Sequence, residues 1–128
     1  AVAIKHRYPG HAVQAGHIAA MCHAGAYLGR FVIVVDEDVN VTDLEEVIWA
    51  ACTRCDPVSN INFIENAWSS ALDPILSPQD RKDGKLYNSR AIIDACRPFH
   101  WKDDFQKVNA PSPDARREAW DRWAHLRE

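Results

Sequence analysis

The sequence predicts a single α/β domain, in which a small, mostly parallel sheet is flanked by helices and followed by a C-terminal amphipathic helix. Residues 31–35 are an unbroken apolar run, as is typical of a strand covered on both faces in a parallel sheet. A helical pattern follows over 43–54, and a strand and a helix also precede the run, giving the order β-α-β-α. With 128 residues, the chain has the size of one domain with a single core.

The first strand and helix are expected over 2–7 and 11–24, joined by a turn at Tyr8-Pro9-Gly10 and ended by Gly25. The helix is apolar or small on nearly every side, so it should lie in close contact with other backbone.

The second helix is expected to begin with a capping box. Thr42 and Glu45 have the spacing in which each side chain bonds the backbone amide of the other. Apolar residues then recur at helical offsets and predict one buried face, made of Leu44, Val47, Ile48, Ala51 and Cys55.

The second half of the chain is predicted to hold a short strand over 61–65, a long connection over 69–88 and a last strand over 90–96 that ends before Pro98. A connection of this length is either functional or flexible. A terminal helix over 114–127 carries one apolar stripe. We therefore divide the chain into an α/β domain, 1–110, and a docking helix, 111–128.

Composition argues against several classes of protein. The net charge is −3 and basic residues are scattered, which argues against nucleic-acid binding. No apolar run approaches the length of a membrane span. The four cysteines lie on or beside elements expected to be buried, which favours reduced thiols and a cytoplasmic protein over a disulfide framework. Because Ala1 already reads as strand, we expect a fragment of a larger protein.

Cysteine and histidine patterns were weighed as metal or redox sites. Cys52 and Cys55 have a suitable spacing, but they lie at a helix end and continue its apolar face, so packing is the favoured role. His17 and His23 point to different faces of one helix. His11 follows a strand end, where α/β sheets bind ligands, yet a hydrogen bond at the helix start is the favoured interpretation.

The acidic turn and the tryptophans of the terminal helix can each be interpreted as structural or as functional. Asp36, Glu37 and Asp38 offer oxygen ligands for a cation, but a solvated turn before a helix is favoured. Trp120 and Trp123 on the terminal helix are expected to dock on the same domain or, preferably, on a neighbouring subunit. These patterns thus predict no metal site in this chain.

Three motifs, in order, resemble the C-terminal domain of the UbiD family of decarboxylases. They are Arg7-Tyr8-Pro9-Gly10-His11, then the strand, acidic turn and helix ending in Thr53-Arg54-Cys55-Asp56-Pro57, and last the strand from Asn88 to Pro98 with Trp101-Lys102 after it. The resemblance covers residues 4 to about 105.

The resemblance implies a function that this chain would serve only in part. UbiD enzymes decarboxylate, or in reverse carboxylate, aromatic and α,β-unsaturated acids with prenylated FMN and a divalent metal ion. In the family, the catalytic Arg and Glu residues and the cofactor ligands lie in the preceding domains. The resemblance therefore implies that this chain contains no catalytic residue, binds no cofactor and is inactive by itself. It also implies that the chain forms a lid, part of the substrate-pocket wall and subunit contacts in a homo-oligomer.

By position after the third strand, Ser70 and Leu72 correspond to the stretch that faces the substrate pocket in the family. Two alternatives stay open: a free-standing α/β module that binds a small ligand, and a module that serves only assembly.

Overall fold

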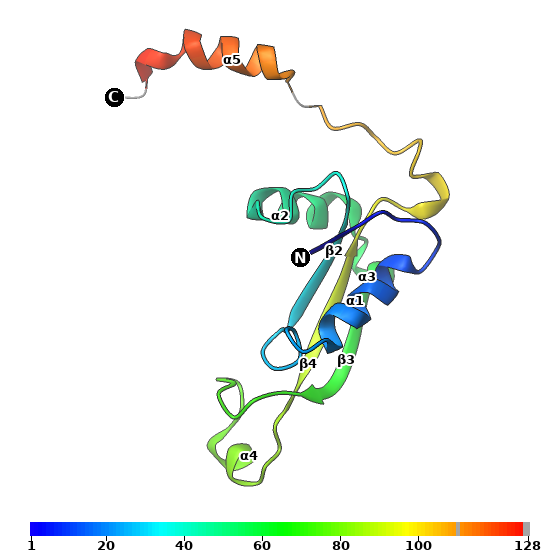
Figure 1. The fold of residues 1–128 in the computed structure, drawn as a ribbon, viewed down its shortest axis with the longest axis vertical. Helices are drawn as coiled ribbons and strands as arrows, with labels where there is room; N and C mark the ends of the chain where they lie inside the picture. Colours follow the sequence, from blue (N-terminus) through cyan, green and yellow to red (C-terminus); the bar gives the residue numbers. More distant parts are fainter. Residues whose placement is uncertain (110, 127–128) are drawn as a thin grey trace.

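The computed structural model describes residues 1–109 and 111–126, which form one four-stranded sheet with helices on both faces (Figure 1). The strands β1 (Val2–Ile4), β2 (Phe31–Asp36), β4 (Tyr87–Ala95) and β3 (Ile61–Trp68) lie side by side in this order. β1, β2 and β4 run parallel, and β3 is antiparallel to β4. The predicted small, mostly parallel sheet is confirmed.

Two apolar clusters form the core, one on each face of the sheet. Helix α1 (His11–Met21) covers one face, where Val34 and Ile92 are fully buried. Helix α2 (Leu44–Arg54) covers the other, where Val35 and Ala95 are fully buried. Neighbouring residues of β2 therefore face opposite clusters, as the unbroken apolar run predicts.

Helix α1 contacts the sheet through a narrow strip of small residues. Ala12, Gly16 and Ala20 are its buried residues, and a Cβ at Gly16 would overlap Cγ2 of Ile92. The predicted close packing of α1 is therefore confirmed, but only for the one face of the helix that carries these small residues. Ile18 and Met21 on the remaining surface are 64% and 58% exposed, so the expected cover on nearly every side is wrong within this chain.

The start of α2 differs from the prediction by one residue. Asp43 is the N-cap and accepts hydrogen bonds from the amides of Glu45, at 2.9 Å, and Glu46, at 3.3 Å. The hydroxyl of Thr42 instead donates to Oδ1 of Asn40 at 2.7 Å. Because Thr42 is engaged with the preceding turn, the predicted capping box does not form.

The buried face of α2 also differs from the prediction. Val47, Ala50 and Arg54 are buried, whereas Leu44 is 72% and Ile48 is 49% exposed. The helix is thus rotated about its axis relative to the prediction. The carboxylates of Asp36 and Asp38 at the edge of the sheet bind Arg54, so the face of α2 that carries Arg54 points inward.

Several element boundaries differ from those expected. β1 ends at Ile4 and α1 at Met21, where Cys22 is the C-cap, so Gly25 does not end the helix. β3 and β4 are longer than predicted because a bulge lets them stay paired past Ile64. Asn66 at this bulge has φ 53, a left-handed conformation that asparagine tolerates better than most residues.

The remaining helices are short or stand at the chain end. α3 (Pro57–Asn60) precedes β3, α4 (Pro78–Lys82) lies in the long connection, and the 3-10 turn η1 (Phe99–Trp101) follows β4. The terminal helix α5 (Pro113–Arg122) continues into the 3-10 turn η2 (Ala124–Leu126). Ala110, the predicted domain boundary, and Arg127, the predicted helix end, lie outside the described residues.

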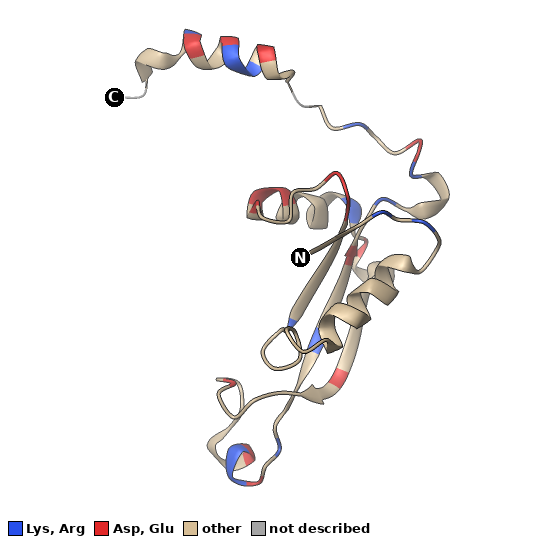
Figure 2. Ribbon diagram, viewed as in Figure 1, with Lys and Arg blue, Asp and Glu red and all other residues tan. Residues whose placement is uncertain are grey.

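Charged residues are distributed unevenly over these elements. Figure 2 shows that α1 carries no charged residue, whereas both signs alternate along α5. Among the described residues, no helix is long and apolar enough to cross a membrane.

Candidate functional site

Two polar centres lie at opposite ends of the strands. The first lies at the carboxyl ends of the parallel strands, and we call this the carboxyl edge of the sheet. Asp36, the last residue of β2, is 3% exposed and accepts three hydrogen bonds at Oδ2. Arg54 Nη1 donates from α2 at 3.0 Å, and Arg97 donates from beyond β4 through its backbone amide, at 2.8 Å, and through Nε, at 3.1 Å. The ion cluster thus joins β2, α2 and β4.

Asp38 completes this ion cluster. Its carboxylate pairs with both nitrogens of the Arg54 fork, at 3.1 and 3.0 Å, and lies 3.7 Å from Arg97 Nη2. Partial burial raises the pKa of Asp38, but the hydrogen bond and charge of Arg54 and the charge of Arg97 outweigh it, so the net pKa is lowered. The carboxylate therefore stays ionised.

The interpretation of the acidic turn as solvated is wrong for Asp36. Glu37 is exposed as expected, but Asp36 is buried and bound by two arginines that are distant in sequence. It also lies against the end of α2 that contains Arg54, so it does not complement the start of that helix.

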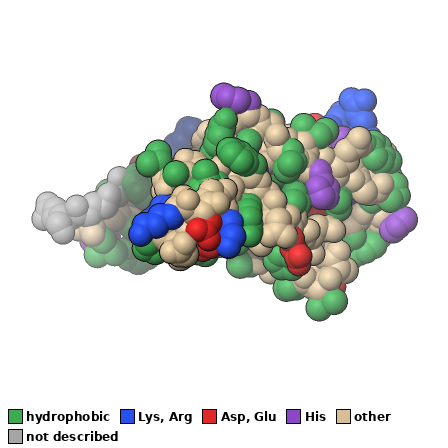
Figure 3. Space-filling model, turned by 90° about the horizontal axis from the view of Figure 1, so that it is seen from below, with side chains coloured by type: hydrophobic (Ala, Val, Ile, Leu, Met, Phe, Trp, Pro, Cys, Tyr) green, Lys and Arg blue, Asp and Glu red, His purple; other side chains and the backbone are tan. Residues whose placement is uncertain are grey.

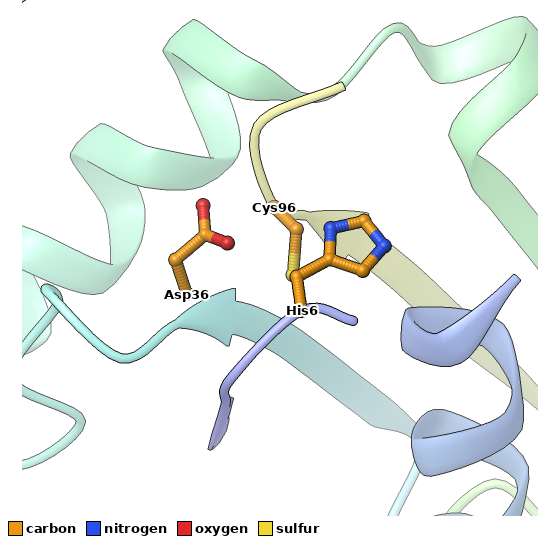
Figure 4. A group of neighbouring side chains, drawn as sticks. All are labelled: His6, Asp36 and Cys96. Carbon is orange, nitrogen blue, oxygen red and sulfur yellow. The ribbon is translucent and has the colours of Figure 1, made fainter. Parts of the chain in front are cut away.

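A second group at this edge was missed by sequence reasoning. His6, Asp36 and Cys96 follow or end β1, β2 and β4, and one ligand atom from each lies within 4.8 Å of the others (Figure 4). Burial and the nearby carboxylates of Asp36 and Asp94 raise the pKa of the Cys96 thiol far above its usual range. A signal was available, because all three residues stand at or near the carboxyl ends of predicted strands, and parallel pairing of those strands would bring such ends together.

The second polar centre lies at the opposite edge, where the connection between β3 and β4 returns beneath β2 (Figure 1). Asp73 is fully buried there and accepts from Ser69 Oγ and Asn88 Nδ2, each at 2.8 Å, and from the amide of Ile75 at 3.1 Å. Arg30, just before β2, forms an ion pair with the same carboxylate.

This network gives the long connection a fixed shape near β3. The hydrogen bond from Asn88 lowers the pKa of Asp73, against the opposing effect of burial, and the bonds from Ile75 and Ser69 and the charge of Arg30 add to it. The carboxylate of Asp73 thus ties residues 69–77 to the starts of β2 and β4.

The predicted pocket residues lie on this fixed loop. Ser70 is half-buried and its Oγ accepts from the amide of Leu72 at 3.2 Å, while Leu72 is 82% exposed. Ile75 nearby is 67% exposed. Figure 3, which views the molecule from this end, shows apolar side chains spread over much of the visible face.

The remaining candidate residues are placed apart from both centres. His17 and His23 are exposed, and His11 accepts a hydrogen bond from the amide of Arg7 at 3.4 Å beside the helix start. On the terminal helix, Trp120 is 62% and Trp123 is 55% exposed.

The cysteines are free, but their burial was only partly predicted. Cys96 is buried and Cys55 is half-buried, whereas Cys22 and Cys52 are exposed. The packing role expected for Cys52 is therefore wrong, because the inward face of α2 is the one that carries Arg54.

Solved structures similar to this chain include a UbiD-class enzyme, a vanillic acid decarboxylase and a 3,4-dihydroxybenzoic acid decarboxylase. The UbiD-class enzyme HmfF from Pelotomaculum thermopropionicum, in complex with FMN, is 26% identical with a TM-score of 0.70, over 88% of this chain and 23% of that one. The vanillic acid decarboxylase of Sedimentibacter hydroxybenzoicus, in open form, is 29% identical with a TM-score of 0.69, over 98% and 26%. The 3,4-dihydroxybenzoic acid decarboxylase of Klebsiella pneumoniae is 27% identical with a TM-score of 0.71, over 93% and 25%.

A curated relative and a family model extend this likeness to the sequence. An uncharacterized protein of Aeropyrum pernix is 31% identical over 129 residues, which cover 95% of this chain and 24% of that protein. The chain thus spans about a quarter of the length of the relatives it matches. The model of the 3-octaprenyl-4-hydroxybenzoate carboxy-lyase C-terminal domain, UbiD_C, matches residues 1–95. With most of the α/β unit matched, the chain belongs to the UbiD family, as a C-terminal domain.

Proposed function

We propose that this chain is the C-terminal lid and assembly domain of an enzyme that reversibly decarboxylates an aromatic or α,β-unsaturated carboxylic acid. The family match over residues 1–95 carries this proposal. The similar vanillic and 3,4-dihydroxybenzoic acid decarboxylases support an aromatic acid as the substrate class.

Prenylated FMN, held with a divalent metal ion by the preceding domains, would supply the electron sink that loss of CO2 requires. The similar enzyme in complex with FMN supports a flavin. The residues of this chain fit a covering role, because the loop at the amino-terminal edge of the parallel strands presents the exposed apolar side chains of Leu72 and Ile75. Such side chains would exclude water from an aromatic ring beneath them.

Ser70 and Leu72 are our candidates for the wall of the substrate pocket. The buried carboxylate of Asp73 holds the loop on which they lie, so their positions would be fixed before substrate binds. The half-buried Ser70 is small enough to leave room for a ring, whereas a large side chain there would fill it. Catalytic acids and bases would come from the preceding domains, and the chain by itself would release no CO2.

The terminal helix would serve assembly. Residues 1–110 would form the lid, and 111–128 would dock on a neighbouring subunit through Trp120 and Trp123, which are largely exposed.

A substitution in the full-length, flavin-loaded enzyme tests the pocket assignment. Ser70→Phe should lower kcat/KM for a substituted aromatic acid by about 10-fold or more relative to a smaller acid, because the added ring would occupy substrate space. Ser59→Phe, the same change on α3 at the other end of β3, should leave that ratio unchanged. An unaltered ratio in Ser70→Phe would remove Ser70 from the pocket wall.

The enzyme assignment is tested separately by assaying CO2 release. The full-length protein should decarboxylate an aromatic or unsaturated acid only when flavin is supplied, and residues 1–128 alone should not. Activity of the isolated chain would overturn the lid assignment.

A further inference from the structure

The inference concerns His6, Asp36 and Cys96, which meet at the edge of the sheet opposite to the proposed pocket wall. β1, β2 and β4 are neighbours and parallel, so their carboxyl ends converge at one point. One ligand atom from each of the three side chains lies within 4.8 Å of the other two. Figure 4 shows the three side chains next to one another, with Cys96 between Asp36 and His6.

His6 has unmet polar groups in a buried position. It is 9% exposed, and both ring nitrogens are buried without a hydrogen-bond partner. Its ring packs against Phe99, with centroids 5.1 Å apart, and Figure 4 shows one nitrogen turned towards Cys96. A buried polar group without a partner costs about 1–3 kcal/mol, so this imidazole is suited to a ligand that the protein alone does not supply.

Asp36 and Cys96 complete a mixed donor set. The hydrogen bonds from Arg54 and Arg97 all end on Oδ2 of Asp36, which leaves Oδ1 for another partner. Cys96 is 2% exposed, so its sulfur is shielded from other thiols. The two arginines also face Asp38, and Asp94 lies close to Cys96. Lys102, which donates to the backbone oxygen of His6 at 3.1 Å, lines the adjoining pocket together with Glu37 and Asp103. Acidic side chains therefore oppose the positive charges around the group.

We propose that His6, Asp36 and Cys96 bind a zinc ion, with water as the fourth ligand. Cys96 is a thiol that donates to the backbone oxygen of Val34, so Zn²⁺ would displace its proton to solvent on binding. Nitrogen, oxygen and the resulting thiolate together suit Zn²⁺, whereas Mg²⁺ and Ca²⁺ require oxygen ligands. A pocket of about 200 Å³ lined by His6, Asp36 and Arg97 adjoins the group and gives water access. Zinc bonds of about 2.0–2.3 Å require the three donors to close by roughly 1 Å.

The zinc ion would fasten the end of β1 and the segment after β4 to β2. It would be separate from the metal ion expected beside the flavin, because its ligands all belong to this chain. The zinc site does not depend on the proposed decarboxylase function. A failed zinc-binding test would therefore leave the proposed function standing, and a failed activity test would leave the zinc site standing.

Metal titration of the full chain, prepared without a histidine tag, tests the site. The chain should bind one Zn²⁺, and Co²⁺ in its place should give a thiolate-to-cobalt absorption band. His6→Gln and Cys96→Ala should each weaken binding by more than about 100-fold, since loss of outer-shell partners alone costs about 10–100-fold. The exposed-residue controls His17→Gln and Cys52→Ser should bind as the parent does.

Thermal unfolding provides a second readout if Cys96→Ala does not fold. Saturating Zn²⁺ should raise the Tm of the parent chain but not that of His6→Gln. No Co²⁺ band in the parent, or an equal Zn²⁺ effect on Tm in the parent and His6→Gln, would overturn the proposal.

Discussion

At the scale of single residues, Arg54 joins two carboxylates where the parallel strands end. Its side chain is 2% exposed and bonds two carboxylates, one of them nearly as buried. An arginine in such a position needs partners for its charge, and here Asp36 and Asp38 supply them. The ion cluster therefore ties the packing of α2 to the end of β2.

Replacing Arg54 by methionine should lower the free energy of unfolding by about 3–5 kcal/mol, because the buried carboxylate of Asp36 loses its buried arginine partner and keeps only Arg97, which is partly exposed. Chemical denaturation of the full chain measures this loss. Arg122→Met is the matched control, since its pair with Glu118 is exposed and should contribute less than about 0.5 kcal/mol. Equal effects of the two substitutions would show that burial of the ion cluster contributes nothing.

Asp73 predicts a dependence of stability on pH. Its pKa is lowered in the folded chain, so its contribution is present above the unfolded pKa of about 3.9 and is lost as pH falls through the lower folded value. The gap in unfolding free energy between the parent and Asp73→Asn should therefore be widest near neutral pH and shrink in acid. Denaturation at a series of pH values measures the gap, and a constant gap would contradict the assignment.

At the scale of elements, local polar contacts decide where α2 begins. Asn40 Oδ1 accepts from the amide and the hydroxyl of Thr42, at 3.1 and 2.7 Å, and Glu46 Oε2 accepts from the amide of Asn40 at 2.8 Å. These bonds form a turn that presents Asp43, one residue after Thr42, to the open amides of the helix.

Asp43→Ala should cost about 1 kcal/mol of stability because the first amides of α2 lose their acceptor. Thr42→Ala should cost less than about 0.5 kcal/mol, as is usual for a surface position. Comparison of the two unfolding midpoints separates the two cap assignments, and a larger loss in Thr42→Ala would restore the capping box that the sequence suggests.

At the scale of the whole molecule, apolar side chains remain exposed at several places. Ile18 and Met21 on α1, Leu72 in the long connection and Trp123 on α5 are each more than half exposed. Exposed apolar surface of this kind marks contact with other protein. It supports the proposal that other domains and a second subunit cover this chain.

Trp120→Ala combined with Trp123→Ala should convert the full-length protein to monomers, since each Trp contributes a large apolar area to a contact. Arg117→Ala combined with Asp121→Ala, on the same helix, should leave the oligomer intact. Sedimentation velocity distinguishes these outcomes, and an oligomer that survives the tryptophan substitutions would place the interface elsewhere.

The sequence alone determined those secondary-structure elements whose signals lie in residues close to one another along the chain. The strand from Phe31, the helix that follows it and the mostly parallel sheet could be predicted because hydrophobic period and helix signals are local. The family could also be recognised, because its motifs are short and contiguous.

Only the tertiary structure decided which distant residues meet. The burial of Asp36 depends on Arg54 and Arg97, and that of Asp73 depends on Arg30 and Asn88, all supplied by other elements. The grouping of His6 with Cys96 likewise arises when parallel strands align. Sequence patterns depend only on residues that are close along the chain. Burial, ion pairing and ligand geometry depend on which strands pair across the sheet, and that pairing joins residues that are distant in sequence.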